Sequence, residues 1–247
     1  MQRFFVEPYQ IEEEMHHIHI NGTDVNHIKN VLRMKCGEDV WISDGGNKEY
    51  HCQIEELRED EVLLHILYAQ EPEYELPNKI YLFQGLPKAD KMELIIQKMV
   101  ELGVYEIVPV SMKRSVVRLD EKKARTKTAR WNAISESAAK QSKRSIIPSV
   151  SEVLSFKQAL ERAKELEMLL LPYECAEGME YTRMVVSKIK PGQSVGIFIG
   201  PEGGFDGDEL KLAREAECNI ITLGKRILRT ETAGMMLMSV IMYNMEE

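Results

Sequence analysis

The stretch VGIFIGPEGGF (residues 195–205) decides the architecture of this 247-residue chain. It opens with an apolar run of strand length and turns at once into a glycine-rich loop. Two more apolar runs end in the same way, MLLL before PYE (168–174) and IITL before GKRILRTET (220–232). Short apolar strands without polar alternation are typical of a parallel sheet covered on both faces. The carboxyl ends of such strands share one edge of the sheet, so we expect the three loops to lie together.

Strands and helices alternate through the whole C-terminal part of the chain. Predicted strands are 80–84, 106–110, 168–171, 194–199 and 219–223, and predicted helices are 88–102, 121–142, 156–165, 208–217 and 230–245. This order predicts an α/β fold with a parallel sheet between helices.

The first 70 residues have a different pattern, with short strands and one helix. Strands are predicted at 3–6, 16–20 and 40–43 and in a hairpin of 49–57 with 61–69, and a helix at 24–34. These elements favour a small β-barrel. The polar stretch EPEYELP (71–77) carries two prolines and no periodicity, so it is interpreted as a linker. We therefore expect a barrel domain at 1–70 and an α/β domain at 78–247.

Composition indicates a soluble globular protein, with 44% hydrophobic and 29% charged residues. No apolar run reaches the length of about 18 residues that spans a bilayer, and the N-terminus shows no secretory signal. The four cysteines form no CxxC pair. We therefore expect reduced, mostly buried thiols and a cytoplasmic location, without membrane association.

The net charge of −8 conceals an uneven distribution of charge. Residues 1–76 carry 6 basic and 17 acidic side chains, whereas residues 111–145 carry 11 basic and 3 acidic ones. A concentrated basic segment on an acidic protein indicates a surface for a polyanion. A solvated helix face explains a segment of this size equally well.

The glycine loop itself limits the choice of ligand. A phosphate-binding loop uses backbone amides together with a lysine and a serine or threonine, but this loop carries Pro201 and Glu202 instead. The GxGxxG pattern of dinucleotide sites is also absent. A single glycine-rich turn is most often only a tight connection, yet three at one edge favour an adenosine-like ligand without a polyphosphate.

The paired motifs IGPEGGF (199–205) and LGKRILRTETA (223–233) resemble the signature of the RsmE-type 16S rRNA (uracil-N3)-methyltransferases of the SPOUT superfamily. KMELIIQKMVELGV (91–104), the region around Arg114 and QSKR (141–144) follow in the expected order, so the resemblance covers the whole chain. Lys140 departs from it, because relatives are expected to carry a glutamate there, and this puts any role for an acid at that position in doubt.

The resemblance implies an enzyme that uses S-adenosyl-L-methionine to methylate N3 of a specific uridine in 16S rRNA, in the decoding region of the small ribosomal subunit. It implies an N-terminal PUA-like RNA-binding barrel and a deep trefoil knot in the C-terminal domain, which ordinary topology rules exclude. It also implies a homodimer through the knotted domain. The apolar face of the last helix fits such an interface and fits ordinary core packing as well.

The resemblance also implies roles for individual residues. The residues expected to contact the cofactor are Leu171, Pro172, Ile199, Gly200, Gly203, Gly204, Leu223, Gly224, Leu228 and Thr230; Leu228 is equally compatible with the core. Arg229 is expected to stabilise the uridine anion, and Glu231 to orient the base or relay its proton. A purely structural ion pair between these two residues is the alternative.

Basic residues of the segment 111–145 are expected to contact RNA phosphates, with Gln141 near the target base. They are Arg114, Arg118, Lys122, Lys123, Arg125, Lys127, Arg130, Lys143 and Arg144, with Lys91, Gln97 and Lys98 as weaker candidates. No metal is expected, because neither a carboxylate nor a cysteine lies at matched spacing from His16, His17 and His19. The alternatives to this function are a non-catalytic RNA-binding protein and an enzyme with another adenosine cofactor.

Overall fold

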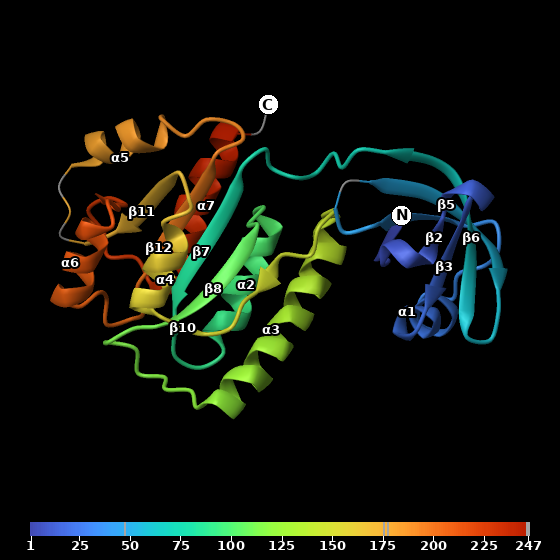
Figure 1. The fold of residues 1–247 in the computed structure, drawn as a ribbon, viewed down its shortest axis with the longest axis horizontal. Helices are drawn as coiled ribbons and strands as arrows, with labels where there is room; N and C mark the ends of the chain where they lie inside the picture. Colours follow the sequence, from blue (N-terminus) through green and yellow to red (C-terminus); the bar gives the residue numbers. More distant parts are fainter. Residues whose placement is uncertain (47, 175, 177, 246–247) are drawn as a thin grey trace. The chain divides into compact units, whose positions relative to one another are not determined.

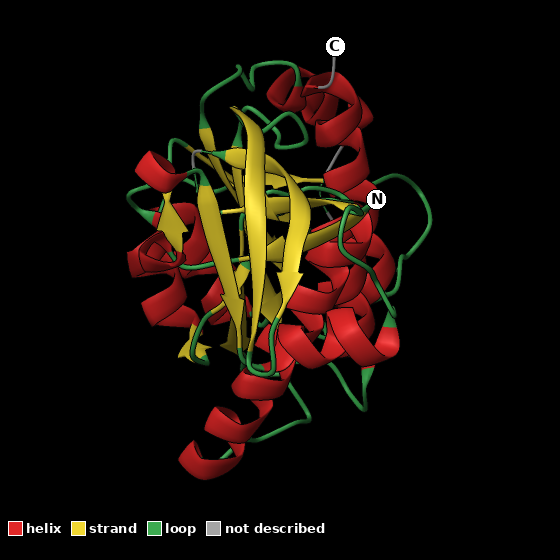
Figure 2. Ribbon diagram, turned by 90° about the vertical axis from the view of Figure 1, so that its right-hand side faces the viewer, coloured by secondary structure: helices red, strands yellow, loops and turns green. Residues whose placement is uncertain are grey.

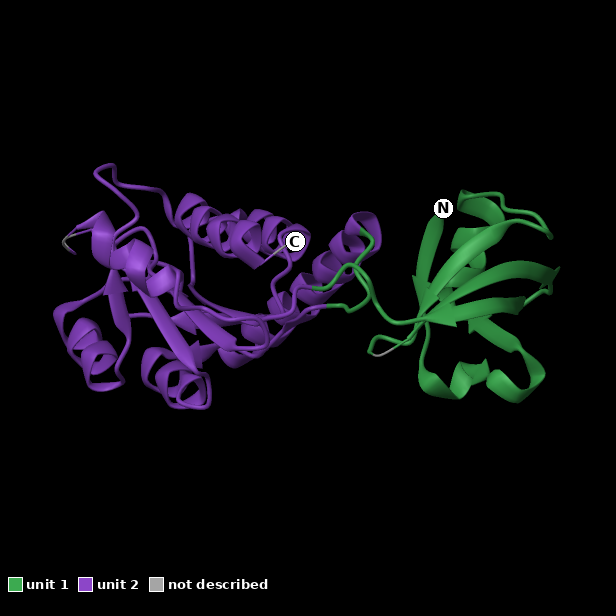
Figure 3. Cartoon of the chain, turned by 90° about the horizontal axis from the view of Figure 1, so that it is seen from above, with its two compact units in different colours: residues 1–75, 143–147 green, residues 76–142, 148–247 purple. Residues whose placement is uncertain are grey.

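The computed structural model describes residues 1–46, 48–174, 176 and 178–245. The chain forms two compact units, residues 1–75 with 143–147 and residues 76–142 with 148–247 (Figure 3). It therefore enters the second unit after residue 75 and returns to the first for residues 143–147. The division expected from the sequence differs at this point, because it kept 143–147 in the C-terminal domain.

The first unit is built on a six-stranded sheet with the order β1-β4-β5-β6-β3-β2. Its strands are β1 (Gln2–Phe5), β2 (Ile11–Glu12), β3 (His17–Asn21), β4 (Asp39–Ser43), β5 (Glu49–Leu57) and β6 (Glu61–Gln70). Only β1 and β4 run parallel. The sheet curls (Figure 2), and no pairing joins its edge strands β1 and β2 within the described residues, so the small β-barrel predicted from the sequence is a half-barrel.

Alternation of residues explains the core of this unit. In β3, Ile18 and Ile20 point inward and are buried, while His17 and His19 lie on the outer face. The helix expected at 24–34 consists of α1 (Thr23–Asn26), which continues as the π-helical turn η3 (His27–Val31). The short 3-10 turns η1 (Pro8–Gln10) and η2 (Glu13–Met15) lie beside β2.

The segment 143–147 is held in the first unit by one buried carboxylate, Glu49, and one partly buried carboxylate, Glu75. Glu49 accepts hydrogen bonds from Arg3 and from the Ser145 hydroxyl. Glu75 accepts from the Ser145 amide at 2.8 Å and forms an ion pair with Arg144. Buried charges need partners of this kind, because leaving water is costly for an ion. These contacts explain why the segment belongs to the first unit.

The second unit contains a seven-stranded sheet, all parallel, with the order β10-β8-β7-β12-β11-β13 and β9 also paired to β8. Its strands are β7 (Lys79–Gly85), β8 (Glu106–Ser111), β9 (Ser149–Val150), β10 (Leu154–Ser155), β11 (Met168–Pro172), β12 (Ser194–Ile199) and β13 (Asn219–Ile221). Its helices are α2 (Lys91–Glu101), α3 (Glu121–Ser142), α4 (Phe156–Ala163), α5 (Met179–Val186), α6 (Gly207–Glu215) and α7 (Thr230–Met245) (Figure 1). The predicted α/β architecture with a parallel sheet is thus confirmed.

Helices cover this sheet in two groups. Helices α4 and α6 share one hydrophobic cluster with the sheet, in which Phe83 and Phe198 stack with ring centroids 4.4 Å apart. Helix α2 packs against both α3 and α7, and α7 also contacts β12. This arrangement leaves the carboxyl ends of β11, β12 and β13 to their loops. Among the described residues, no helix is both long and apolar enough to cross a membrane.

Candidate active site

The three loops predicted to meet do enclose one cavity, of about 530 Å³. Its walls come from the loops that follow β11, β12 and β13, together with Lys91 and Arg114. Nine of the ten residues expected to bind the cofactor line it, namely Pro172, Ile199, Gly200, Gly203, Gly204, Leu223, Gly224, Leu228 and Thr230. The parallel sheet produces this convergence, since it brings segments 50 residues apart to one edge.

Leu171 is the exception among these ten residues. Its side chain is fully buried in the cluster beneath α4 and α6 and does not line the cavity. The wall begins one residue later, at Pro172. Sequence reasoning could not separate the two positions, because an apolar run does not mark where its last core residue lies.

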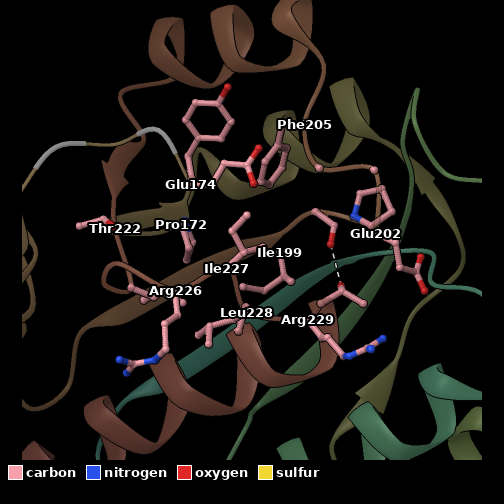
Figure 4. Close-up of a pocket in the computed structure, with 18 of the residues that line it drawn as sticks. Pro172, Glu174, Ile199, Glu202, Phe205, Thr222, Arg226, Ile227, Leu228 and Arg229 are labelled. Atoms are coloured by element: carbon pink, nitrogen blue, oxygen red, sulfur yellow. Dashed lines mark hydrogen bonds between the residues drawn. The ribbon is translucent and has the colours of Figure 1, made fainter.

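The middle of the cavity is apolar. Pro172, Ile199, Ile227 and Leu228 gather there, with Arg226 to one side and Arg229 and Glu202 to the other (Figure 4). Flat apolar walls suit a purine ring, and the glycine loops bring backbone polar groups to the same space. Further lining residues were not identified from the sequence; they are Tyr173, Glu174, Phe205, Thr222, Arg226, Ile227 and Ala233. Their only sequence signal is adjacency to the motifs.

Close backbone approach explains two of the glycines. A Cβ on Gly85, at the end of β7, would lie 2.7 Å from the backbone nitrogen of Pro201. A Cβ on Gly203 would lie 3.0 Å from Cβ of Arg114. Any side chain at either position would therefore displace the loop that follows β12.

A buried chain of hydrogen bonds joins three elements behind the cavity. The Gln84 amide donates to the Thr230 hydroxyl at 2.8 Å, and this hydroxyl donates to the Gly200 carbonyl at 2.6 Å. Gln84 and Thr230 are both buried. The first residue of α7 is thereby tied to β7 and to the glycine loop.

Glu202 is paired rather than isolated among the loop amides. Its carboxylate accepts hydrogen bonds from the Lys88 amide at 3.1 and 3.3 Å and lies 3.2 Å from the Lys91 ammonium. Partial burial acts to raise the pKa of Glu202, but backbone amides and Lys91 outweigh it, so this pKa lies below its usual value. The Glu202 carboxylate therefore stays ionised at the cavity. Its negative charge disfavours a phosphate as the ligand.

The two candidate catalytic residues, Arg229 and Glu231, differ in their exposure and in their neighbours. Arg229 is exposed and lines the cavity. Glu231 is 16% exposed at its side chain and lies 3.2 Å from Lys91. Arg229 and Glu231 do not form the ion pair that was the alternative reading of these residues, because the cation next to Glu231 is Lys91.

Two of the predicted RNA-binding arginines support the loops near this site. Arg114 is half exposed, lines the cavity and donates to the Gly203 carbonyl at 3.2 Å. Arg118 donates to the carbonyls of Met112 and Lys113. Their guanidinium groups therefore hold backbone in place as well as contributing positive charge.

Helix α3 presents most of the remaining basic segment to solvent. Its exposed members are Lys122, Lys123, Arg125, Arg130 and Gln141, while Lys127 is half-buried near the ring of Trp131. Several of them have acidic partners on the surface, such as Asp120, 3.2 Å from Lys123, and Glu93, 2.8 Å from Arg130. Pairs at the surface are weak and exchange readily with other ligands.

Arg144 requires a correction. It was expected to contact RNA phosphates, but its side chain is 4% exposed and is paired with Glu75. A census of charge along the chain cannot detect this partner, which lies in the predicted linker. Lys143, next to it, is exposed and has a positive φ of 62°.

The histidines of β3 also gain neighbours that their spacing did not indicate. His17 lies 2.9 Å from Glu55, and the ligand atoms of His17, Glu55 and His65 all lie within 4.8 Å of one another on the outer face of the sheet. His19 is 2.8 Å from Glu61. These partners come from β5 and β6, so the spacing of residues around the histidines in the sequence could not indicate them.

Comparison with known proteins matches both parts of the chain to domain families of RNA methyltransferases. Residues 74–242 match the RNA methyltransferase domain family, and residues 20–67 match the RNA methyltransferase PUA domain family. The chain is 39% identical to ribosomal RNA small subunit methyltransferase E of Bacillus subtilis (strain 168), over 100% of this chain and 98% of the relative. The protein of the same name from Mesomycoplasma hyopneumoniae (strain 232) is 34% identical over 97% of this chain and 98% of its own length.

A solved structure extends this likeness to the fold. Ribosomal RNA small subunit methyltransferase E from Neisseria gonorrhoeae, bound to S-adenosyl methionine, superposes with a TM-score of 0.83 and 31% identity, over 99% of this chain and 98% of that one.

Proposed function

This chain belongs to the family of ribosomal RNA small subunit methyltransferase E, and from that membership we propose that it methylates N3 of a specific uridine in the decoding region of 16S rRNA. It is an RNA methyltransferase, and S-adenosylmethionine is its methyl donor. The observation that supports the proposal most directly is the cavity formed by the three loops, where apolar walls and close-approaching glycines fit an adenosine moiety.

The bound cofactor would supply a methyl group on a positively charged sulfur. We assign the cavity residues Pro172, Ile199 and Leu228 to the walls around adenine, and the backbone of the glycine loops to its polar edges. Glu202 and Glu231 add negative charge near the cavity, which suits a cationic donor better than a phosphate.

Uridine N3 carries a proton that must leave before this nitrogen can act as a nucleophile. Arg229 lines the cavity and would stabilise the negative charge that develops on the base, while Glu231 would orient the base or relay the proton. The deprotonated N3 would then form a bond to the methyl carbon, and the electron pair of the broken sulfur–carbon bond would remain on the sulfur of the donor. Holding both groups in line supplies part of the rate enhancement.

The RNA substrate would contact the exposed basic side chains of α3 and the first unit. We assign Lys122, Lys123 and Arg130, which are exposed, to phosphates, and the exposed Gln141 to the target base. The half-barrel, with the linker 71–77, would serve as a PUA-like RNA-binding domain that recognises shape, because its net charge is negative. A substrate within the small ribosomal subunit would place the enzyme in the cytoplasm.

The proposal includes a homodimer and a deep trefoil knot in the second domain, as the family resemblance implies. Val240 and Tyr243 of α7 are exposed, which suits an interface along this helix. Sedimentation equilibrium tests the dimer. A monomer at all concentrations would contradict it.

Unmethylated small subunits provide the test of the target. The protein is incubated with these subunits and isotopically labelled S-adenosylmethionine, and the nucleosides of the digested RNA are then identified by mass spectrometry. N3-methyluridine at a single position is the expected product. Label in any other nucleoside would overturn the N3 assignment without changing the class of enzyme.

A further inference from the structure

Lys91, the first residue of α2, connects the two signature loops of the site. Its ammonium lies 3.2 Å from Glu202 in the loop after β12 and 3.2 Å from Glu231 in the first turn of α7. Lys91 also lines the cofactor cavity. One ammonium therefore contacts a carboxylate from each motif, at the border of the space where methyl transfer would take place.

Glu231 depends on this contact. Its Oε2 atom is buried and has no hydrogen-bond partner in the described part of the chain, so the Lys91 ammonium is its compensating charge. Glu202, by contrast, also receives the Lys88 amide. Removing Lys91 would leave the partly buried Glu231 carboxylate without its neighbouring cation, while Glu202 would keep a donor.

The neighbouring backbone fixes the position of Lys91. Ala89, just before the helix, has a positive φ of 54°, and the Glu93 amide donates to the Asp90 carbonyl as α2 begins. The Lys88 amide binds Glu202 from the same turn. The start of α2 thus contacts the glycine loop through both backbone and side chain.

We propose that Lys91 is a positioning residue for methyl transfer, which holds Glu231 in place for the target base and fixes Glu202 at the same time. The inference rests on the function proposed above for Glu231. Contact with an RNA phosphate, the weaker role suggested by the sequence, is not required, because both nearby carboxylates already use the ammonium.

The test compares methyl transfer by Lys91→Met, Lys91→Arg, Glu231→Gln and the double variant Lys91→Met/Glu231→Gln. Methionine keeps the aliphatic stem and removes the charge, whereas arginine keeps the charge. Activity is measured as total label incorporated into unmethylated small subunits, with kcat and KM determined separately. Lys164→Met is the matched control, because Lys164 pairs with Glu161 at 2.6 Å on the surface and does not line the cavity.

Lys91→Met is expected to lower kcat by about tenfold or more, with cofactor affinity measured by calorimetry changed by less than about threefold. Lys91→Arg should recover part of the lost kcat. If Lys91 acts through Glu231, the double variant should be no slower than Glu231→Gln alone, since residues in one network are not additive. Lys164→Met should match the unsubstituted protein.

Three results would overturn the inference. They are an unchanged kcat in Lys91→Met, a double variant whose loss is the product of the two single losses, and a loss confined to cofactor affinity. Thermal unfolding midpoints of all variants identify any loss of activity that comes from misfolding. If Lys91→Met is misfolded, the kcat of Lys91→Arg decides whether the inference holds. Because total label counts methyl groups wherever they are placed, a product other than N3-methyluridine would contradict the proposed target and leave this comparison valid.

Discussion

Thr230 has a single hydroxyl that serves both as acceptor for Gln84 and as donor to Gly200. This residue is the first of α7 and lines the cofactor cavity. Its role is structural, because its two hydrogen bonds hold the start of α7 at a fixed distance from the loop that follows β12. These two segments carry the two motifs of the site.

Thr230→Val keeps the shape of the side chain and removes the hydroxyl. The Gln84 amide would then keep only its bond to the Gly85 carbonyl, and the Gly200 carbonyl would lose this donor, so we expect a loss of about 1–3 kcal/mol in the free energy of unfolding. Weaker binding of S-adenosylmethionine should accompany it. Urea unfolding and calorimetry measure the two effects. Thr126→Val, on the exposed face of α3, should change neither, and a wild-type midpoint for Thr230→Val would contradict the assigned role.

At the scale of single residues, the sequence predicted the residues that line the cavity well where a glycine-containing turn follows an apolar strand. Gly200, Gly203 and Gly224 are such positions, and all three line the cavity. Ile227 and Phe205 escaped because apolar side chains in a loop carry no signal that distinguishes wall from core. Lys91 was only a weaker candidate for RNA contact, and the sequence could not show its two carboxylate partners, which lie more than 100 residues away.

At the scale of elements, helix α6 is stabilised by its first turn. Asp206 caps it, Glu209 completes the capping box, and Lys113 binds the Asp206 carboxylate at 2.8 Å. The Lys113 ammonium and the Asp208 amide hold the pKa of Asp206 below its usual 3.8. A carboxylate with a depressed pKa in the folded state contributes stability above its unfolded pKa and loses it as the pH falls further.

Stability is therefore expected to fall on acidification through the region of pH 3.8 and below, and Asp206→Asn should show a smaller fall than the unsubstituted protein. Urea midpoints measured from neutral to acidic pH provide the comparison. Glu215→Gln, exposed at the other end of α6, serves as the control and should retain the full fall. Parallel curves for Asp206→Asn and the unsubstituted protein would contradict the role of the cap.

Helix α3 carries the prediction for RNA. If Lys122 and Lys123 bind phosphates, Lys122→Gln/Lys123→Gln should reduce the dependence of log affinity on log salt by about 1.5 units, since each contact contributes roughly 0.7–0.9. Binding to small subunits is measured by filter retention across a salt series. Lys211→Gln on α6 should leave the slope unchanged. An unaltered slope in the double variant would show that RNA binds elsewhere.

Long elements were predicted closely, and α3 and β12 have the predicted bounds. The two-residue strands β9 and β10 were not predicted, because they exist only through pairing with β8. The helix expected from residue 88 begins at Lys91, since Ala89 adopts a left-handed conformation. Such features depend on tertiary contacts rather than on local preference.

At the scale of the whole molecule, the return of residues 143–147 to the first unit could not be predicted. Their charge suggested an RNA surface, whereas Arg144 and Ser145 are buried against Glu75 and Glu49. Periodicity identifies the two kinds of fold, but it does not show a segment that crosses between them.

Ser145→Ala tests this connection. The substitution removes a hydrogen bond to the buried carboxylate of Glu49, so we expect the first unit to lose about 1.5–3 kcal/mol of stability. Each unit has one tryptophan, Trp41 in the first and Trp131 in the second. Fluorescence of Trp41 in a Trp131→Phe background follows unfolding of the first unit. Ser149→Ala, exposed in β9, is the control, and equal midpoints for the two variants would contradict the expectation.

The same crossing has a consequence for synthesis of the protein. All six strands of the first unit have left the ribosome once residue 75 has emerged. Arg144 and Ser145, which complete the partners of Glu75 and Glu49, are added only after the whole of α3 has been translated. During that interval the half-barrel holds two carboxylates without their later partners. The nascent N-terminal unit should therefore reach its final resistance to proteases only when residue 147 is free of the exit tunnel, which makes its maturation dependent on a domain that is translated after it.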